Sequence, residues 1–176
     1  NPDFDTTALA AKAEFLLGNY ELSLSSYYRY DTTERAALTL TGPLGNFDIF
    51  VEGVVGRGSP KTFYSFSTSP PDYFSESKAS DHRKEFYPSA TAGFLYSDQN
   101  NNFTAIAQYY YNGESYSDAD RTKNIDALTA LVEVPPPGYT KDAIIALGKL
   151  AASFSGQHYG AANLSLSEIA GSDFSF

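Results

Sequence analysis

The sequence predicts an all-β fold, in which antiparallel strands follow one another up and down and close into a barrel. About eight strands fit into the 176 residues, and three observations lead to this expectation. Segments of about ten residues alternate between apolar and polar positions, as strands with two different faces do. The connections between them alternate in length. The composition is rich in residues that favour strands, with 14 Tyr and 13 Phe.

The predicted strands are regular enough to be assigned one by one. In the second, Leu22 and Leu24 point to one side and Glu21 to the other, and in the fourth Ile49 opposes Asp48. In order, the predicted strands cover 7–17, 20–30, 35–41, 47–56, 86–97, 103–111 and 158–166, and an eighth begins at Phe174.

The connections divide into two classes. Tight turns rich in Gly, Asn, Asp and Pro are predicted at 18–19, 42–46, 98–102 and 167–173. The connections between them are 31–34 and the long loops 59–85 and 112–157. In an up-and-down order, all tight turns fall at one end of the strands and both long loops at the other. Short turns at one end and long loops at the other are typical of a transmembrane β-barrel.

A short helix is predicted within the second long loop, over 140–154. Ile144, Leu147, Ala151 and Phe154 recur near helical spacing, and Thr140 is suited to cap the first turn. We expect this outer loop to fold over or into a pore.

Aromatic residues are predicted at both ends of the apolar faces, with small aliphatic residues between them. Such an arrangement is the girdle of a membrane barrel, and strands of eight to ten residues tilted near 40° span roughly 20–25 Å of apolar band. The predicted girdle consists of Tyr20, Tyr28, Tyr30, Phe47, Phe86, Tyr96, Phe103, Tyr109 and Tyr111.

The opposite faces carry the charges, which suits a hydrated interior. The predicted lumen-lining residues are Lys12, Glu14, Glu21, Arg29, Arg35, Asp48, Glu52 and Gln108. They are candidates for lining a permeation path, or for a network of mutual salt bridges that keeps the interior hydrated and rigid. The outer face of a soluble sheet is the alternative interpretation of the same pattern.

Segments such as YELSLSSYYRY, FTAIAQYYYNG and HYGAANLSLSEIAGSDFSF resemble those of bacterial outer-membrane β-barrels of the porin-like kind. The resemblance covers most of the chain and concerns an architecture rather than a signature motif. It implies a single barrel domain or barrel portion over 1–176, in contact with outer-membrane lipid and acting as a pore for small solutes. A homo-oligomer or a complex with other envelope proteins is compatible with it. Because the eighth strand is cut short at Phe176, we expect a portion of a larger barrel.

Composition narrows the alternatives. Zero Cys excludes disulfides, and a formal charge of −9 with a pI near 4.5 argues against nucleic acid as a partner. No cofactor, metal site or enzymatic activity is predicted, although Glu114, Asp118 and Asp120 carry oxygen ligands of the kind that Ca²⁺ takes. Two other functions remain open: a non-transport outer-membrane barrel (an adhesin, a structural protein or an export component), and a soluble extracellular β-barrel or sandwich that binds a ligand.

Overall fold

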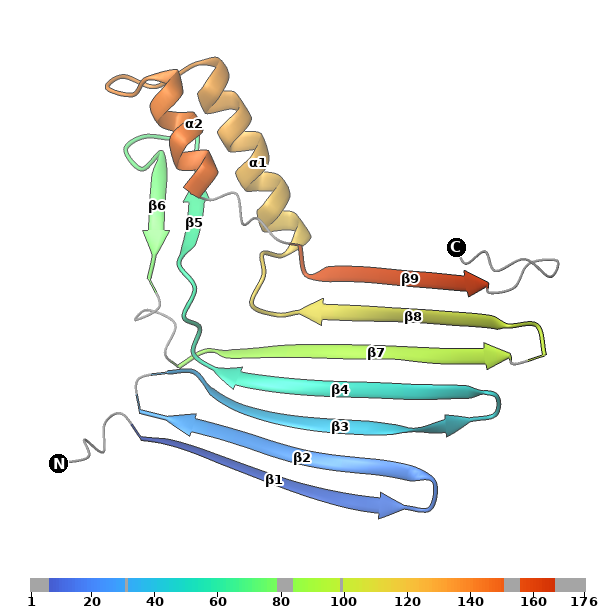
Figure 1. Ribbon diagram of the computed structural model, residues 1–176. Coiled ribbons are helices and arrows are strands. Elements are labelled where there is room, and N and C mark those ends of the chain that lie inside the picture. The colour runs from blue at the N-terminus through green and yellow to red at the C-terminus, as the bar shows by residue number, and fades with distance from the viewer. Residues whose placement is uncertain (1–6, 31, 79–83, 99, 151–155, 167–176) are drawn as a thin grey trace.

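The molecule is built on one antiparallel sheet of seven strands in the order β1-β2-β3-β4-β7-β8-β9 (Figure 1). The computed structural model describes residues 7–30, 32–78, 84–98, 100–150 and 156–166. The sheet strands are β1 Ala8–Leu17, β2 Tyr20–Arg29, β3 Glu34–Leu44, β4 Phe47–Arg57, β7 Phe86–Asp98, β8 Phe103–Asn112 and β9 His158–Leu166. The antiparallel up-and-down order predicted from the sequence is thus confirmed, and the predicted eighth strand lies outside the described residues.

The turns after β1, β3 and β7 lie at one end of the sheet, as predicted, and the short connection from β2 to β3 lies at the other (Figure 1). The turn predicted over 167–173 lies outside the described residues. Gly18 and Gly45 open the two-residue turns after β1 and β3, with φ of 65° and 64°, and an asparagine follows each. Glycine adopts this left-handed conformation without steric cost, and such two-residue loops fit the twist of a hairpin. We call the end with these turns the turn end, and the opposite one the loop end.

The predicted turn over 42–46 is wrong, because β3 continues to Leu44 and only Gly45 and Asn46 form the turn. Turn-forming residues misled the prediction. Pro43 pairs with Asp48 of β4, but β2 pairs with β3 only as far as Thr41. Pro43 therefore has a paired strand on one side only, and a missing backbone N–H is tolerated there.

Both long connections leave the loop end and pack together there as a separate unit, the cap (Figure 1). The first contains a hairpin that the sequence did not predict, β5 Phe63–Phe66 paired with β6 Phe74–Ser77. The second contains two helices, α1 Asp118–Glu133 and α2 Lys141–Leu150. Only α2 matches the predicted helix, and 151–155 lie outside the described residues.

Each helix of the cap starts at a capping hydroxyl. Ser117 Oγ accepts a hydrogen bond from Asp120 N at 3.1 Å, and Thr140 Oγ1 accepts one from Ala143 N at 3.2 Å. Gly148 lets the helices approach, since a Cβ there would lie 2.8 Å from a Leu128 methyl. Neither helix in this described part of the chain is long and apolar enough to span a membrane.

The buried core belongs to the cap and not to the sheet. Among the described residues, the buried hydrophobic side chains are Phe66, Ala127, Leu131 and Ile144, and Tyr64, Tyr73, Phe74, Leu128, Val132 and Leu147 pack against them. No large hydrophobic residue of the seven-stranded sheet is buried in the described part of the chain. Large apolar side chains therefore remain exposed on the sheet, most of them on one of its two faces.

Candidate functional site: the charged face of the sheet

The strand register aligns the alternating residues into two continuous faces. Leu22 pairs with Phe15 and Leu40, and this parity carries across all seven strands. We call one side the apolar face, formed by Leu9, Ala11, Ala13, Phe15, Leu17, Tyr20, Leu22, Leu24, Ser26, Tyr28, Ala36, Leu38, Leu40, Gly42, Leu44, Phe47, Ile49, Val51, Gly53, Val55, Phe86, Pro88, Ala90, Ala92, Phe94, Tyr96, Phe103, Ala105, Ala107, Tyr109, Tyr111, His158, Gly160, Ala162, Leu164 and Leu166. The Asp, Glu, Lys and Arg residues of this face are Glu34, Arg57 and Asp98, and they fall only at its two ends.

The predicted girdle residues lie toward the two ends of the apolar face. At the turn end, the ring of Phe47 lies 5.3 Å from that of Tyr96, which lies 6.0 Å from that of Phe103. The Tyr20 ring covers Gly42, whose missing Cβ would meet it at 2.4 Å.

The other predicted girdle residues lie toward the loop ends of their own strands but do not share one register row. Phe86 pairs with Arg57, whereas Tyr109 pairs with Ala92 and Tyr111 with Ala90. Tyr28 lies near the loop end of β2, and exposed Tyr30 follows that strand.

His158 joins the aromatic side chains at the loop end. Its ring lies 6.0 Å from that of Tyr109 and 5.4 Å from that of Tyr111, and its Nδ1 shares a 2.6 Å hydrogen bond with the Tyr109 hydroxyl. The histidine is therefore held among aromatic side chains.

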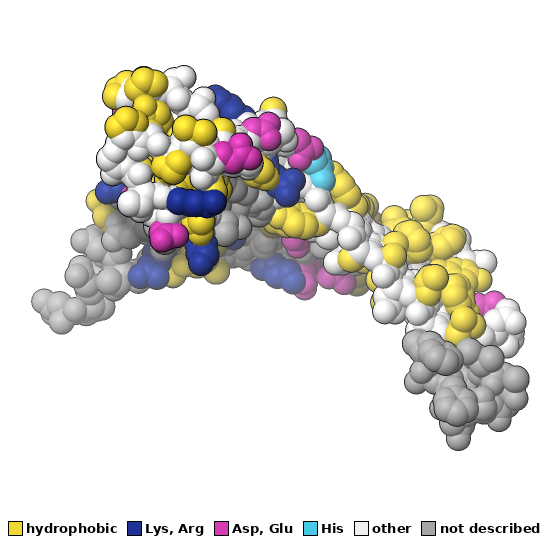
Figure 2. Space-filling view, turned by 90° about the horizontal axis from the view of Figure 1, so that it is seen from above, with side chains coloured by type: hydrophobic (Ala, Val, Ile, Leu, Met, Phe, Trp, Pro, Cys, Tyr) yellow, Lys and Arg dark blue, Asp and Glu magenta, His cyan; other side chains and the backbone are white. Residues whose placement is uncertain are grey.

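The predicted lumen residues share the opposite side of the sheet, which we call the charged face. In Figure 2, Lys, Arg, Asp and Glu side chains lie along the concave underside of the arched sheet, and hydrophobic side chains cover much of its other side toward the right. The register places on the charged face Lys12, Glu14, Glu21, Arg29, Arg35, Asp48, Glu52 and Gln108. Seven of them lie on β1 to β4, and Gln108 lies apart on β8.

These charges do not form a mutual salt-bridge network, so that alternative is wrong for the part of the chain that the structure describes. Lys12 and Glu14, two residues apart on β1, are the one pair within the group. Arg35 instead pairs at 3.9 Å with Glu114, which lies outside the sheet. Most of the described charged side chains on this face therefore have no ion-pair partner on the same face.

Cations and carboxylates on the charged face occupy different rows. Glu14 and Glu52 share a row, because Glu14 pairs with Ser23, Ser23 with Thr39, and Thr39 with Glu52. Glu21 and Asp48 lie closer to the turn end. Toward the loop end follow the row of Lys12, then that of Arg35, then Arg29. Three cations thus face the loop end and four carboxylates the turn end.

A hollow of about 340 Å³ opens on the loop-end half of the charged face. Its walls come from β1, β2 and β3, and the polar residues that line it are Lys12, Ser25, Ser26, Tyr27 and Arg35. No carboxylate contributes to it among the described residues. Arg29 lies two residues beyond Tyr27 on the same face, and its Nε is buried without a hydrogen-bond partner in the described structure.

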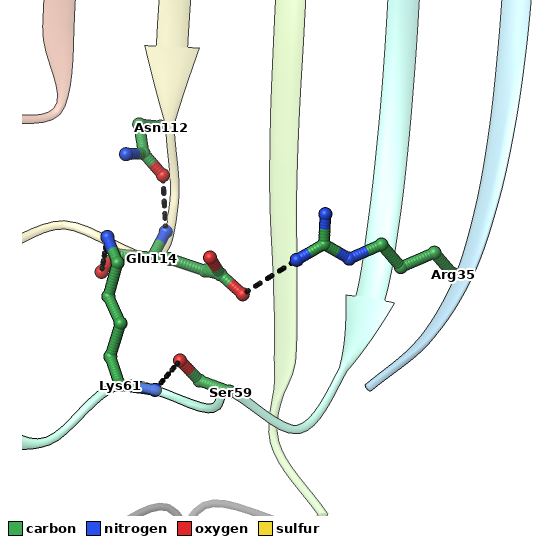
Figure 3. Close-up of polar contacts among 5 residues, drawn as sticks. All are labelled: Arg35, Ser59, Lys61, Asn112 and Glu114. Carbon is green, nitrogen blue, oxygen red and sulfur yellow. Dashed lines mark hydrogen bonds and ion pairs between the residues drawn. The ribbon is translucent and has the colours of Figure 1, made fainter. Parts of the chain in front are cut away.

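The base of the cap joins the charged face through residues that the sequence did not single out for this role. Figure 3 shows the Glu114 carboxylate turned toward Arg35, while Glu114 O accepts a hydrogen bond from Lys61 Nζ at 3.4 Å. Asn112 Oδ1 accepts a bond from Glu114 N at 3.1 Å, and buried Ser59 Oγ one from Lys61 N at 3.1 Å. Both long connections therefore meet beside Arg35.

Tyr116 ties the hairpin of the cap to the segment before α1. Its hydroxyl accepts a hydrogen bond from Tyr64 N at 2.6 Å and donates one to Tyr64 O at 3.1 Å. Burial of the phenol raises the pKa of Tyr116 above its ordinary value of 10.0, even though the hydrogen bond to the backbone of Tyr64 opposes the rise.

We expect the cap to loosen in alkali because of this phenol. Since the folded pKa of Tyr116 lies above the unfolded one, its stabilising effect is complete below about pH 10 and is lost as pH rises through the folded pKa. Limited proteolysis of the cap from pH 8 to 11 measures this loss. Tyr116→Phe should be cleaved faster at pH 8 and show a weaker dependence on pH. An alkaline profile identical to that of the wild type would refute the assignment.

The Ca²⁺ alternative does not fit the geometry. Glu114 turns to Arg35, and Ser117 Oγ donates a hydrogen bond to Asp120 Oδ2 at 2.5 Å at the start of α1. Within the described ranges, no three His, Asp or Glu side chains come together in a way that could hold a metal ion.

The cap has an open groove of its own, between the 66–69 segment and the first turns of α1. Its volume is about 1040 Å³, and hydroxyls and charged groups line it, among them Ser67, Thr68, Asp118, Lys123 and Asp126. Asn124, buried next to it, accepts a hydrogen bond from Phe66 N at 2.8 Å and so fixes this wall.

Comparison with known proteins found no matching family model, no similar curated protein and no similar solved structure. The two faces of the sheet and the cap are therefore the features that bear on function.

Proposed function

We propose that the chain forms a bacterial outer-membrane β-barrel, or a portion of one, and acts as a passive pore for small solutes. The apolar face carries this proposal. It extends over seven strands, carries aromatic residues toward both of its ends, and leaves Leu9, Leu24, Leu38, Val51 and Leu164 between 43% and 66% exposed. Soluble monomers rarely expose contiguous apolar patches beyond a few hundred Å², whereas lipid favours such a surface.

The charged face supports the second half of the proposal. In a barrel whose apolar face meets lipid, the other face lines the interior, where charged side chains remain hydrated and act on passing ions. Closure supplies partners for the outer edges of β1 and β9, because lipid offers no hydrogen bonds to an open sheet edge. The tight turns then face the periplasm and the cap lies at the outer surface.

Two measurements test the pore. We expect the purified protein to need detergent for solubility and to give discrete conductance steps in planar lipid bilayers. A monodisperse protein without detergent would refute the membrane assignment and favour a soluble sheet protein. Detergent dependence without any current would refute the pore alone.

A non-transport barrel is the second candidate, and the cap favours it. Two connections that pack around their own core, with an open groove between them, form a more elaborate outer surface than a plain pore requires. An adhesin or surface receptor would use this groove, and binding to cells or matrix that is lost when the cap is removed would support it.

A further inference from the structure

The inference concerns the order of charges along the charged face and rests on the proposed pore. From the loop end, Arg29 comes first, then Arg35, then Lys12, and only beyond them do Glu14 and Glu52 share a row. Rows on one face lie two residues apart, roughly 7 Å along a strand. An ion that enters from the loop end therefore passes Glu114 beside Arg35 and meets three cations before any carboxylate that the sheet strands carry on this face.

Among the described residues, two of the three cations lack a close ion-pair partner. Lys12 is paired with Glu14, and Arg35 has Glu114 at 3.9 Å, longer than the usual distance of about 2.8 Å for a charge-assisted hydrogen bond. Arg29 has no ion pair among the described residues, and its Nε is buried without an acceptor. A buried donor without an acceptor destabilises the folded protein, and a ligand that accepts its hydrogen bond removes that cost.

The hollow supplies the remaining contacts. The hydroxyls of Ser25 and Tyr27 stand beside Arg35 and Lys12 in its walls, and no described carboxylate lines it. Guanidinium groups present paired donors that match the oxygens of carboxylate and phosphate. The hollow therefore combines two cations and three hydroxyl-bearing residues, which are groups that can bind an anion, with three alanines, and Arg29 lies beyond its lining.

We propose that Lys12, Arg29 and Arg35 form an anion-binding site in the loop-end half of the pore, which takes small solutes that carry a phosphate or carboxylate group. Glu114 competes with the solute for Arg35, so an arriving anion displaces the contact between the cap and the sheet. The carboxylates of the turn-end half repel the anion, which therefore dwells in the hollow. The pore conducts unequally in its two directions, because the fixed charges change sign along its axis.

Inorganic phosphate is the probe. We measure its block of the KCl current in planar bilayers, and its affinity for the detergent-solubilised protein by titration calorimetry. Phosphate added at the loop end should block at lower concentration than phosphate added at the turn end. Arg29→Gln should weaken both block and affinity about tenfold, the effect expected from one charge-assisted hydrogen bond.

Arg57→Gln is the matched control. Arg57 also lies at the loop end, but on the side of the apolar face, where it pairs with Glu34 at 3.8 Å. This variant should bind phosphate as the wild type does. If Arg29→Gln proves poorly folded, Arg35→Lys keeps the charge, removes the paired donors and should weaken binding severalfold.

The outcomes separate the anion site from the pore. Phosphate binding that is weakened in Arg29→Gln, without any current, upholds the site and refutes the pore. A current with phosphate block that is equal in wild type and Arg29→Gln upholds the pore and overturns the site. Absence of measurable phosphate binding by the wild type also overturns the site.

Discussion

Replacing Leu38 with arginine should destabilise the protein in lipid vesicles by about 2–4 kcal/mol, the cost of a cation at the middle of the lipid-facing side of a barrel. Leu38 lies midway along β3 on the apolar face and is 48% exposed. Leu44→Arg, at the turn end of the same strand, should cost only about 0–1 kcal/mol, because there the side chain reaches the interface. Urea unfolding from vesicles measures both.

Thr39→Arg is the control for this series. Thr39 is the next residue in β3, on the charged face, and it pairs with Glu52. A cation there meets a carboxylate and water, so stability should change by no more than about 0.5 kcal/mol. Equal losses for Leu38→Arg and Leu44→Arg would indicate packing against a second protein layer instead of a depth-dependent lipid environment.

Replacing Ile144 with alanine should open the cap and leave the sheet intact. Ile144 is 2% exposed at the centre of the cap core, and removing a buried isoleucine side chain costs about 2–5 kcal/mol. The few other buried side chains in this core leave little to compensate. Limited proteolysis should therefore cut within 59–78 and 112–150 well before the strands.

Ile145→Ala provides the comparison, since the neighbouring side chain is 36% exposed. Its cap should resist the protease nearly as well as that of the wild type. If the two alanine variants were cut at the same rate, the core around Ile144 would not hold the cap together.

The strands were predictable because each one carries its own period-two pattern. The ends of β8 and β9 could be predicted from their own residues. The prediction for β3 was too short, because Gly42 and Pro43 are residues that favour turns. Pairing with β4 outweighed that local preference. The assignment of side chains to two faces followed from the same alternation.

The cap could not be predicted in the same way. The first half of α1 is polar, so its apolar spacing is weak, although Ser117 followed by Asp120 and the later Pro135 mark its two ends. Strand β5 has four residues and gains its partners only in the folded cap. The contact of Glu114 with Arg35 joins segments that are distant in the sequence, and no pattern in the sequence around either residue predicts it.

The construction of the cap from two separate connections also sets an order of assembly. Every pair of neighbours in the sheet is also consecutive among the sheet strands, so the sheet can grow one strand at a time. The cap must bring together Phe66 and Asn124, which are 58 positions apart, and it encloses the β7–β8 hairpin between its two halves. Closing a loop of this length costs conformational entropy, and only the contacts of the completed cap offset that cost. We therefore expect the cap to form after the β7–β8 hairpin has paired with β4.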